Sequence, residues 1–494
     1  MQNNNSSNNE YQNINNFYDP NAEPPFINNQ NGFIIESDIP PKNHNKSNSP
    51  NNKEKEKQKQ NALTLIKNSV VIEPISRISL LGVFKDIGAT LYYGFNTNPI
   101  FNEAQAAIPV VIFNHLIYNK FKLKSILISL YNTIFQMTYR SSFPDLLKKN
   151  YFTEDVITSD NGWGCMIRSC QMMLSKGIIE RKIYKYKKEN NVDEMYYMNL
   201  LQIRKETLFL FYDNYVSMEK TLGHPDYQNF YKQFETIAKQ EQKYQNIIGV
   251  FPPYSIQTIC DVMGCVGTWT SDIKVIKTIL EINKLFFNNE DSYLYFCDGN
   301  ISEKKLLSAF CKEEPMIVSS DSEIKYKQFE SFPESNYYIY KGKTYSFLKG
   351  GIIFISLRLG LSTVTEEYLG SVINLFSKIR NNIGFVGGRN GKAYYFIGVT
   401  DLPDLPEMSD ISLVLKGKLL YLDPHLNQKA VDPETDEGQT YIVKYVYQLD
   451  PKELSSQFTF GVVINNQVDL TNFISDIRGL KASKYNYDFL NIID

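Results

Sequence analysis

Cysteine, histidine and tryptophan are scarce in this chain of 494 residues, which has six, four and two of them. So few cysteines cannot form the disulfide scaffold of a small secreted protein. The two pairs spaced C-x4-C, which begin at Cys165 and Cys260, lack the C-x2-C spacing of a typical structural zinc site. We therefore expect free thiols, and neither a metal ion nor a cofactor.

A strong net charge and long apolar runs are missing too. The net charge of -2 gives no overall field that would attract nucleic acid. No apolar stretch approaches the roughly 18 residues of a membrane span, and the opening MQNNNSSNNEYQ lacks the pattern of a secretory signal. Hydrophobic residues still make up 43% of the chain, which is enough for a large core. The sequence predicts a soluble, cytoplasmic protein.

Composition divides the chain into a tail, a folded domain and a second tail. Residues 1–61 are rich in Asn and Ser and end in a run of mixed charge, which predicts a disordered tail. Residues 62–476 carry the apolar patterns of a folded domain, and a polar, irregular stretch near 288–350 predicts an insertion within it. We interpret residues 477–494 as a C-terminal tail.

Helical periodicity dominates the first half of the domain, and short strands dominate the second half. Apolar residues at helical spacing over 121–139 predict a helix that leads into a turn at 141–144. Later segments predict a strand at 350–361, a helix at 366–379 and short strands at 383–388, 393–399 and 418–424. This order indicates an α+β fold.

The segment TSDNGWGCMIRSCQMM, residues 158–173, places a cysteine directly after Gly-Trp-Gly. Apolar residues recur at helical spacing after Cys165, so the cysteine is expected at a helix start, capped by Ser159, Asp160 or Asn161. Unpaired backbone N–H groups at such a start favour the thiolate, which is the reactive form of a sulfur nucleophile. The alternative is a buried cysteine in an ordinary helix, which would not require the two glycines.

A cysteine nucleophile needs a base, and four histidines leave few choices. His44 lies in the predicted tail, His115 lies in an apolar segment typical of a core histidine, and His224 follows a glycine in a turn. His425 ends the sequence YLDPH. On an extended backbone, positions i and i+2 share a face, so Asp423 can orient the imidazole. The alternative is a surface Asp-Pro turn with a stray histidine.

The glycine-rich segment 387–392 resembles a phosphate-binding loop at first sight. The spacing G-x4-G-K would need a glycine at Val386, and no Ser or Thr follows Lys392. We interpret the segment as the turn of a hairpin. Pairs of acidic residues for glycoside hydrolysis or metal binding do not occur at a recognisable spacing.

These motifs, in this order, resemble the autophagins, the cysteine proteases of autophagy. The similarity covers most of the predicted domain, with matching motifs at 80–82, 137–144, 158–172, 254–257, 267–269, 356–361, GFVGG, YYFIG and YLDPH. It implies a papain-like α+β core with a smaller family-specific subdomain. In that core, a helix that carries Cys165 packs on a sheet that carries Asp423 and His425.

The resemblance also implies individual roles. The nucleophile of the family falls on Cys165, its aspartate on Asp423 and its histidine on His425, and Tyr139 matches a tyrosine that stabilises the oxyanion. Trp269 matches a tryptophan that covers the cleft together with a loop, which falls here on Gly388, Arg389, Asn390 and Gly391. The chain departs from the family pattern at Cys170, where glycine is usual, and at Asn390, where proline is usual.

The family cleaves a ubiquitin-like autophagy modifier after its C-terminal glycine, either to prime it or to release it from phosphatidylethanolamine. The resemblance therefore implies that modifier as a partner, free and lipid-conjugated, with transient contact to a membrane surface and none with nucleic acid. Two rival functions are a catalytically weak scaffold that binds the modifier and another papain-like hydrolase of the deubiquitinase type. The complete Cys, Asp and His set disfavours the scaffold.

The C-terminal segment YDFLNII has an aromatic residue, Phe489, three positions before an aliphatic one, Ile492. With an acidic neighbour, this spacing is typical of short motifs that dock on such modifiers by strand addition. The alternative is an apolar chain end that packs on the protein's own core.

Overall fold

The structure is a computed structural model that describes residues 110–117, 133–149, 154–192, 197–214, 251–287, 293–314, 337–389, 391–400, 417–432, 438–443, 445–483 and 485–493. All of them belong to one compact unit, Leu81–Asp494. The predicted Asn-rich tail over 1–61 lies outside the described residues.

Helices and strands both contribute to this unit. The α-helices are α4 (Cys165–Asn190), α5 (Tyr197–Leu208), α8 (Ile256–Met263), α9 (Asp272–Phe287), α10 (Glu303–Phe310), α11 (Glu366–Lys378) and α13 (Gln467–Leu480). The strands of the large sheet are β1 (Val110–Ile112), β2 (His115–Ile117), β5 (Tyr293–Asp298), β10 (Gly351–Thr363), β11 (Asn382–Arg389), β12 (Lys392–Thr400), β13 (Lys418–Leu422), β15 (Tyr447–Leu449) and β16 (Ser455–Ile464).

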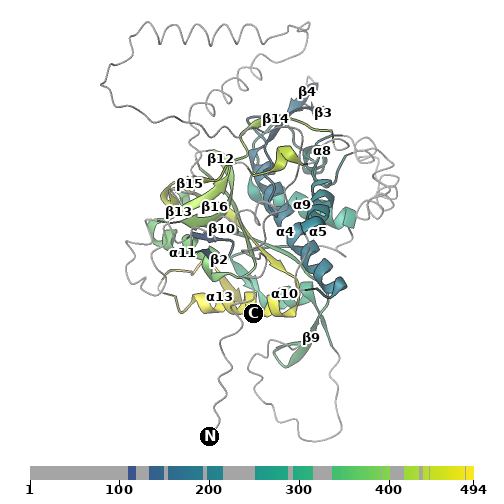
Figure 1. Cartoon of the computed structure of the whole chain (residues 1–494). Helices are drawn as coiled ribbons and strands as arrows, with labels where there is room; N and C mark the ends of the chain where they lie inside the picture. The colour runs from purple at the N-terminus through teal and green to yellow at the C-terminus, as the bar shows by residue number, and fades with distance from the viewer. Residues whose placement is uncertain are drawn as a thin grey trace, which may run out of the picture. The chain divides into compact units, whose positions relative to one another are not determined.

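The large sheet has the strand order β15-β13-β12-β11-β16-β10-β5, and β1 joins it at β12. Neighbours are antiparallel except β10 and β5, which run parallel. Helices α4, α5, α8 and α9 gather on one side of the sheet, and α11 lies on the other (Figure 1). Helix α4 contacts β11, β12 and β16 directly. This arrangement confirms the predicted α+β class, with the Cys165 helix packed on the sheet.

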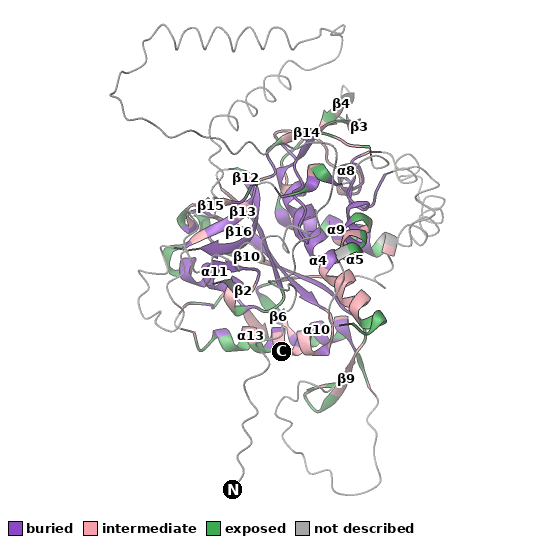
Figure 2. Ribbon diagram, viewed as in Figure 1, coloured by how far each residue is buried: buried purple, intermediate pink, exposed green. Residues whose placement is uncertain are grey.

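Strand β10 shows why the sheet is buried on both faces. Ile352 and Phe354 face the apolar cluster that includes α4, whereas Ile353 and Ile355 face the cluster that includes α11 and α13. This is the alternation of side chains that a strand imposes. Because both faces are covered, the strand reads as a continuous apolar run in the sequence. Figure 2 shows the resulting layer of buried residues through β10 and β16.

A smaller sheet with the order β14-β3-β4 lies beside the start of α4. Its strands are β3 (Tyr139–Lys149), β4 (Glu154–Ser159) and β14 (Asn427–Lys429). Strand β14 pairs with β3 in parallel, with Asn427 opposite Tyr139. Because β4 leads to Cys165 and β14 follows His425, this sheet joins two distant parts of the chain.

The predictions for the segment before α4 were partly wrong. Residues 133–138 form no helix, and Tyr139 opens strand β3, while 121–132 lie outside the described residues. The turn expected at 141–144 is an irregularity inside β3, where Ser142 has a φ of 58° and the register with β4 shifts. Apolar spacing alone did not reveal that this segment pairs with strands far along the chain.

The stretch 288–350, predicted as an insertion, contains regular structure where it is described. Strand β5 belongs to the large sheet, and α10 follows it. The other strands are β6 (Asn300–Ser302), β7 (Cys311–Glu313), β8 (Tyr337–Tyr340) and β9 (Lys343–Phe347), with β7, β9 and β8 forming a separate sheet. The polar composition therefore does not mark loops throughout, and the insertion itself stays a prediction.

Candidate active site

Three residues shape the turn that leads into α4. Gly162 has a φ of 81°, a conformation that suits glycine. A Cβ on Gly164 would overlap the carboxylate of Asp160, so this glycine is required by close packing. Trp163 lies between them, is buried, and donates from Nε1 to the carbonyl oxygen of Ser159 at 3.0 Å. The geometry of the turn thus accounts for the Gly-Trp-Gly pattern.

Helix α4 begins at Cys165, as the sequence predicts. Its N-cap is Gly164, and no side chain caps it, so the predicted capping by Ser159, Asp160 or Asn161 is wrong. The carboxylate of Asp160 instead accepts from the backbone N–H of Arg140 and from Nε of Arg168. The first backbone N–H groups of α4 therefore donate to no capping side chain.

Asp423 and His425 are held together as their spacing predicts. Strand β13 ends at Leu422, and Nδ1 of His425 lies 2.5 Å from Oδ1 of Asp423. The same oxygen accepts the backbone N–H of His425 at 2.9 Å. Asp423 therefore fixes the ring through Nδ1 and directs the opposite nitrogen, Nε2, towards a second group.

The second group is the sulfur of Cys165, which is only 5% exposed. It makes a side-chain hydrogen bond with His425, and it also accepts from the hydroxyl of Tyr139 and from the backbone N–H of Ala393. Four segments of the chain, separated by long stretches of sequence, thus meet at one sulfur. Sequence reasoning found three of them and missed Ala393, because a backbone donor has no side-chain signature.

The electrostatics of the pair favour charge separation. Burial raises the pKa of the Cys165 thiol, but the hydrogen bonds and the charge of His425, with Ala393 and Tyr139, hold it below its ordinary value. Burial lowers the pKa of His425, but Asp423 and the Cys165 sulfur raise it to about 9. Both shifts favour the ion pair of thiolate and imidazolium over the neutral pair.

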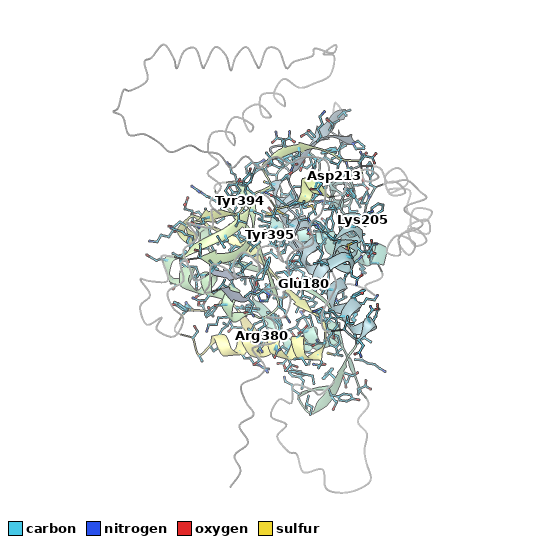
Figure 3. All side chains as sticks on the ribbon, in the orientation of Figure 1. Glu180, Lys205, Asp213, Arg380, Tyr394 and Tyr395 are labelled. Atoms are coloured by element: carbon cyan, nitrogen blue, oxygen red, sulfur yellow. The ribbon has the colours of Figure 1, made fainter. Side chains whose placement is uncertain are left out.

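Two aromatic rings flank the imidazole. Tyr139 meets the His425 ring edge-on with centroids 5.3 Å apart, and Tyr394 of β12 meets it with centroids 5.5 Å apart. Tyr394, labelled in Figure 3, also packs on Tyr421 at 4.5 Å. Sequence reasoning quoted Tyr394 within a motif but gave it no role. Its contact depends on β12 and β13 lying side by side.

Trp269 lies between the turn before Cys165 and the hairpin that joins β11 to β12. Its side chain is 63% exposed, yet Nε1 donates to the carbonyl oxygen of Gly162 at 2.7 Å. On the other side, a Cβ on Gly391 would lie 2.7 Å from the indole ring. Arg389 pairs with Lys392 across the hairpin, which confirms the hairpin interpretation. Asn390 lies outside the described residues, and Gly388 is in β11.

Comparison with known proteins identifies the family of this chain. The model of the peptidase C54 catalytic domain matches residues 124–476. The chain belongs to the peptidase C54 family. It is 24% identical to cysteine protease ATG4B of Gallus gallus over 354 residues, 69% of this chain and 73% of that one. It is 23% identical to cysteine protease ATG4B of Xenopus laevis over 350 residues, 68% and 72% of the two chains.

A yeast relative extends the match. The probable cysteine protease ATG4 of Scheffersomyces stipitis is 22% identical over 392 residues, 79% of this chain and 54% of the relative. This C54 protease is thus a cysteine protease of the autophagin family in the autophagy pathway, with the papain-like α+β fold that its motifs imply. The smaller subdomain implied by the resemblance stays a prediction.

Among the residues that the structure describes, no group of three or more His, Cys, Asp or Glu side chains is arranged to bind a metal ion. In the same residues, no helix combines the length and the apolar character needed to cross a membrane.

The C-terminal segment of the C54 protease differs from the expectation of a free tail. Helix α13 runs to Leu480, and β17 (Asn491–Ile493) pairs in parallel with β6. Phe489 meets the ring of Tyr368 edge-on at 5.3 Å, and Ile492 packs against the apolar cluster of α11 and α13. The alternative that the sequence left open, a chain end packed on the core, describes this segment. Docking on a modifier through Phe489 and Ile492 would require these side chains to give up their contacts with the core.

Proposed function

We propose that the enzyme is an endopeptidase that cleaves a ubiquitin-like autophagy modifier after its C-terminal glycine. One observation carries the catalytic part of this proposal: the buried sulfur of Cys165 is hydrogen-bonded to His425, and Asp423 lies 2.5 Å from the other ring nitrogen. The motifs shared with the autophagins support the choice of substrate. In our proposal the modifier is cut both in its extended precursor and in its conjugate with phosphatidylethanolamine.

The proposed chemistry uses these groups in order. The thiolate of Cys165 attacks the carbonyl carbon of the glycine, and the hydroxyl of Tyr139 donates to the oxyanion that forms. The C–N bond breaks as His425 gives its proton to the leaving amine. His425 then takes a proton from water, which attacks the thioester and releases the modifier with a free C-terminal carboxylate. Asp423 holds the imidazole throughout.

Glycine selectivity is assigned in our proposal to the space beneath Trp269. The indole spans from Gly162 to Gly391, so a substrate chain that enters there would run through a narrow passage. A residue without a Cβ fits such a passage best. Hydrolysis of the amide bond does not itself require glycine, so in this proposal the selectivity comes from shape.

The lipid-conjugated substrate implies where the enzyme works. We propose a cytoplasmic enzyme that touches the membrane surface only while it releases the modifier. No contact with nucleic acid is part of the proposal.

The decisive experiment supplies two substrates: a modifier with a C-terminal extension, and the same modifier conjugated to phosphatidylethanolamine in vesicles. The wild-type enzyme should cleave both, and Cys165→Ala should bind both and cleave neither. Cys170→Ala is the matched control, since it removes a buried sulfur from the same helix. A wild-type enzyme that binds both substrates without cleaving either would be a scaffold, and the proposal would be wrong.

Selectivity has its own test. Replacing the cleaved glycine of the substrate by alanine should lower kcat/KM by about 100-fold or more, because the added methyl group has no space. Trp269→Ala should bring the kcat/KM values for the glycine and alanine substrates closer together, even if both values fall. An unchanged ratio would show that the selectivity lies elsewhere.

A further inference from the structure

Strand β3 connects the two halves of the candidate site. At its start, the backbone N–H of Tyr139 donates to the carbonyl oxygen of Pro424 at 2.8 Å, between Asp423 and His425. This bond continues the pairing of β3 with β14. The strand that carries the Tyr139 hydroxyl is therefore fixed directly to the segment that carries the base. A second set of contacts holds the same strand to the segment that carries Cys165.

Asp160, which is fully buried, makes these contacts. Its Oδ1 accepts the backbone N–H of Arg140 at 2.6 Å, and its own N–H donates to the carbonyl oxygen of Arg140 at 3.2 Å. Arg140 directly follows Tyr139 in the chain. One residue thus closes two hydrogen bonds on β3 next to the tyrosine.

The remaining acceptors of Asp160 bind the start of α4. Oδ2 accepts from Nε of Arg168 at 2.7 Å, one turn beyond Cys165. The backbone carbonyl of Asp160 accepts the N–H of Trp163 at 3.2 Å and that of Gly164 at 2.8 Å. Gly164 lies so close that a side chain there would overlap the carboxylate. The carboxylate therefore joins β3, the turn and the helix in one buried contact.

We propose that Asp160 is a positioning residue that sets the distance between the Cys165 sulfur and the groups carried or held by β3, namely Tyr139 and His425. This inference rests on the proposed catalytic roles of those three residues. Asp160 touches neither the substrate nor the sulfur, and it acts through the two backbone segments that it joins. Loosening them would weaken the thiolate–imidazolium pair and displace the oxyanion donor together.

Asp213 supplies a matched comparison. Asp213, labelled in Figure 3, is buried like Asp160 and pairs with the same Arg168, through Nη1 at 2.6 Å. Its other oxygen accepts the backbone N–H of Ile256 at 2.9 Å, at the start of α8. Both aspartates therefore neutralise one arginine, but only Asp160 hydrogen-bonds to β3 and the turn before Cys165. A purely structural role predicts equal consequences for the two.

The test compares Asp160→Asn with Asp213→Asn in the full-length chain. Both should lower the midpoint of thermal unfolding, because each leaves Arg168 with one buried carboxylate. Asp160→Asn should also lower kcat on the extended modifier by about 30-fold with KM changed less than about threefold, since geometry and not capture is lost. Asp213→Asn should keep kcat within about threefold of the wild type at a temperature where both variants are folded.

A second readout follows the Cys165–His425 pair without any substrate. The rate at which iodoacetamide alkylates Cys165 is measured against pH, because it reports the thiolate fraction. Asp160→Asn should move the apparent pKa of Cys165 upward, and Asp213→Asn should leave it unchanged. Should Asp160→Asn fail to fold, Gly164→Ala serves instead, because it pushes the turn away from an intact carboxylate and should shift the same profile.

The outcomes separate this inference from the proposed function. Turnover that survives in Cys165→Ala would overturn the proposed function itself. If Cys165→Ala is inactive but the two aspartate variants lose kcat equally, or the alkylation profile of folded Asp160→Asn matches the wild type, only the positioning role of Asp160 is wrong.

Discussion

The first and second turns of α4 carry two buried sulfurs with opposite behaviour. Cys165 is 5% exposed and Cys170 is fully buried, and burial raises the pKa of both thiols. At Cys170, the nearby Asp272 raises it further, so this pKa lies well above its ordinary value. At Cys165, the hydrogen bond and the charge of His425 instead help to hold the pKa of the thiol below its ordinary value. Depth in the core therefore does not distinguish a nucleophile; the donors that reach the sulfur do.

The largest effect on this comparison is expected when either member of the Cys165–His425 pair is removed. Cys165→Ala or His425→Ala should reduce cleavage of the extended modifier to below about 0.1% of the wild-type rate, because neither can form the acyl-enzyme at a useful rate. Cys170→Ala should stay within about threefold of the wild type, since it removes only packing. Rates are measured by gel densitometry on folded variants. Retention of a tenth of the activity by either site variant would contradict the assignment.

The next test weakens the Cys165–His425 pair but keeps both residues. Asp423 and the Cys165 sulfur raise the pKa of His425 to about 9 against the effect of burial, so activity should rise as Cys165 ionises and fall as His425 loses its proton near pH 9. Asp423→Asn should lower kcat by about 100-fold or more and move the alkaline limb to lower pH. A pH–rate profile checks both. An alkaline limb that stays near pH 9 would remove Asp423 from the pair.

A smaller effect is expected from the ring that flanks His425 on β12. Tyr394→Leu should lower kcat by about fivefold, because an aromatic edge contact is worth about 1 kcal/mol and helps to fix the imidazole. Tyr394→Phe keeps the ring and should remain near the wild type. Steady-state kinetics on the extended modifier distinguishes the two. Equal losses in both variants would point to the hydroxyl instead.

The smallest effect on chemistry is expected at the C-terminal strand, where Phe489 and Ile492 pack on a different apolar cluster from that of Cys165. Phe489→Ala with Ile492→Ala should lower the free energy of unfolding by about 2 kcal/mol, because both side chains pack on the core, and leave kcat unchanged. Denaturant unfolding and kinetics on the soluble substrate measure this. A raised KM with unchanged stability would instead support docking of this segment on the modifier.

The positions of the candidate site residues could be predicted from the sequence where the signal is local. Cys165 opens its helix because Gly162 and Gly164 fit one turn, and Asp423 orients His425 because the two are neighbours on an extended backbone. The strands around YYFIG and YLDPH were predictable because their apolar runs are short and bounded by turns.

The rest depends on partners that lie far along the chain. Asp160 has the chemistry of a helix cap, but Arg140 and Arg168 engage its carboxylate, and no local pattern reveals them. Ala393 contributes only a backbone N–H. The helix predicted over 121–139 and the turn predicted at 141–144 missed strand β3, because its partners β14 and β4 give no local signal. The C-terminal spacing fitted both a docking motif and a packed chain end, and tertiary contacts made the difference.

The contact between the β3 region and the Asp423 segment determines when the site can assemble during synthesis of the chain. The bond from the side chain of Gln136, which lies just before β3 in the chain, to the carbonyl oxygen of Asp423 spans 287 residues of sequence, so this part of the molecule closes only after most of the chain has been synthesised. Contacts of such long sequence separation form late and slowly. A ribosome therefore carries the cysteine long before its histidine emerges, and the nascent chain holds an ordinary thiol. Proteolytic activity therefore arises only with the completed fold.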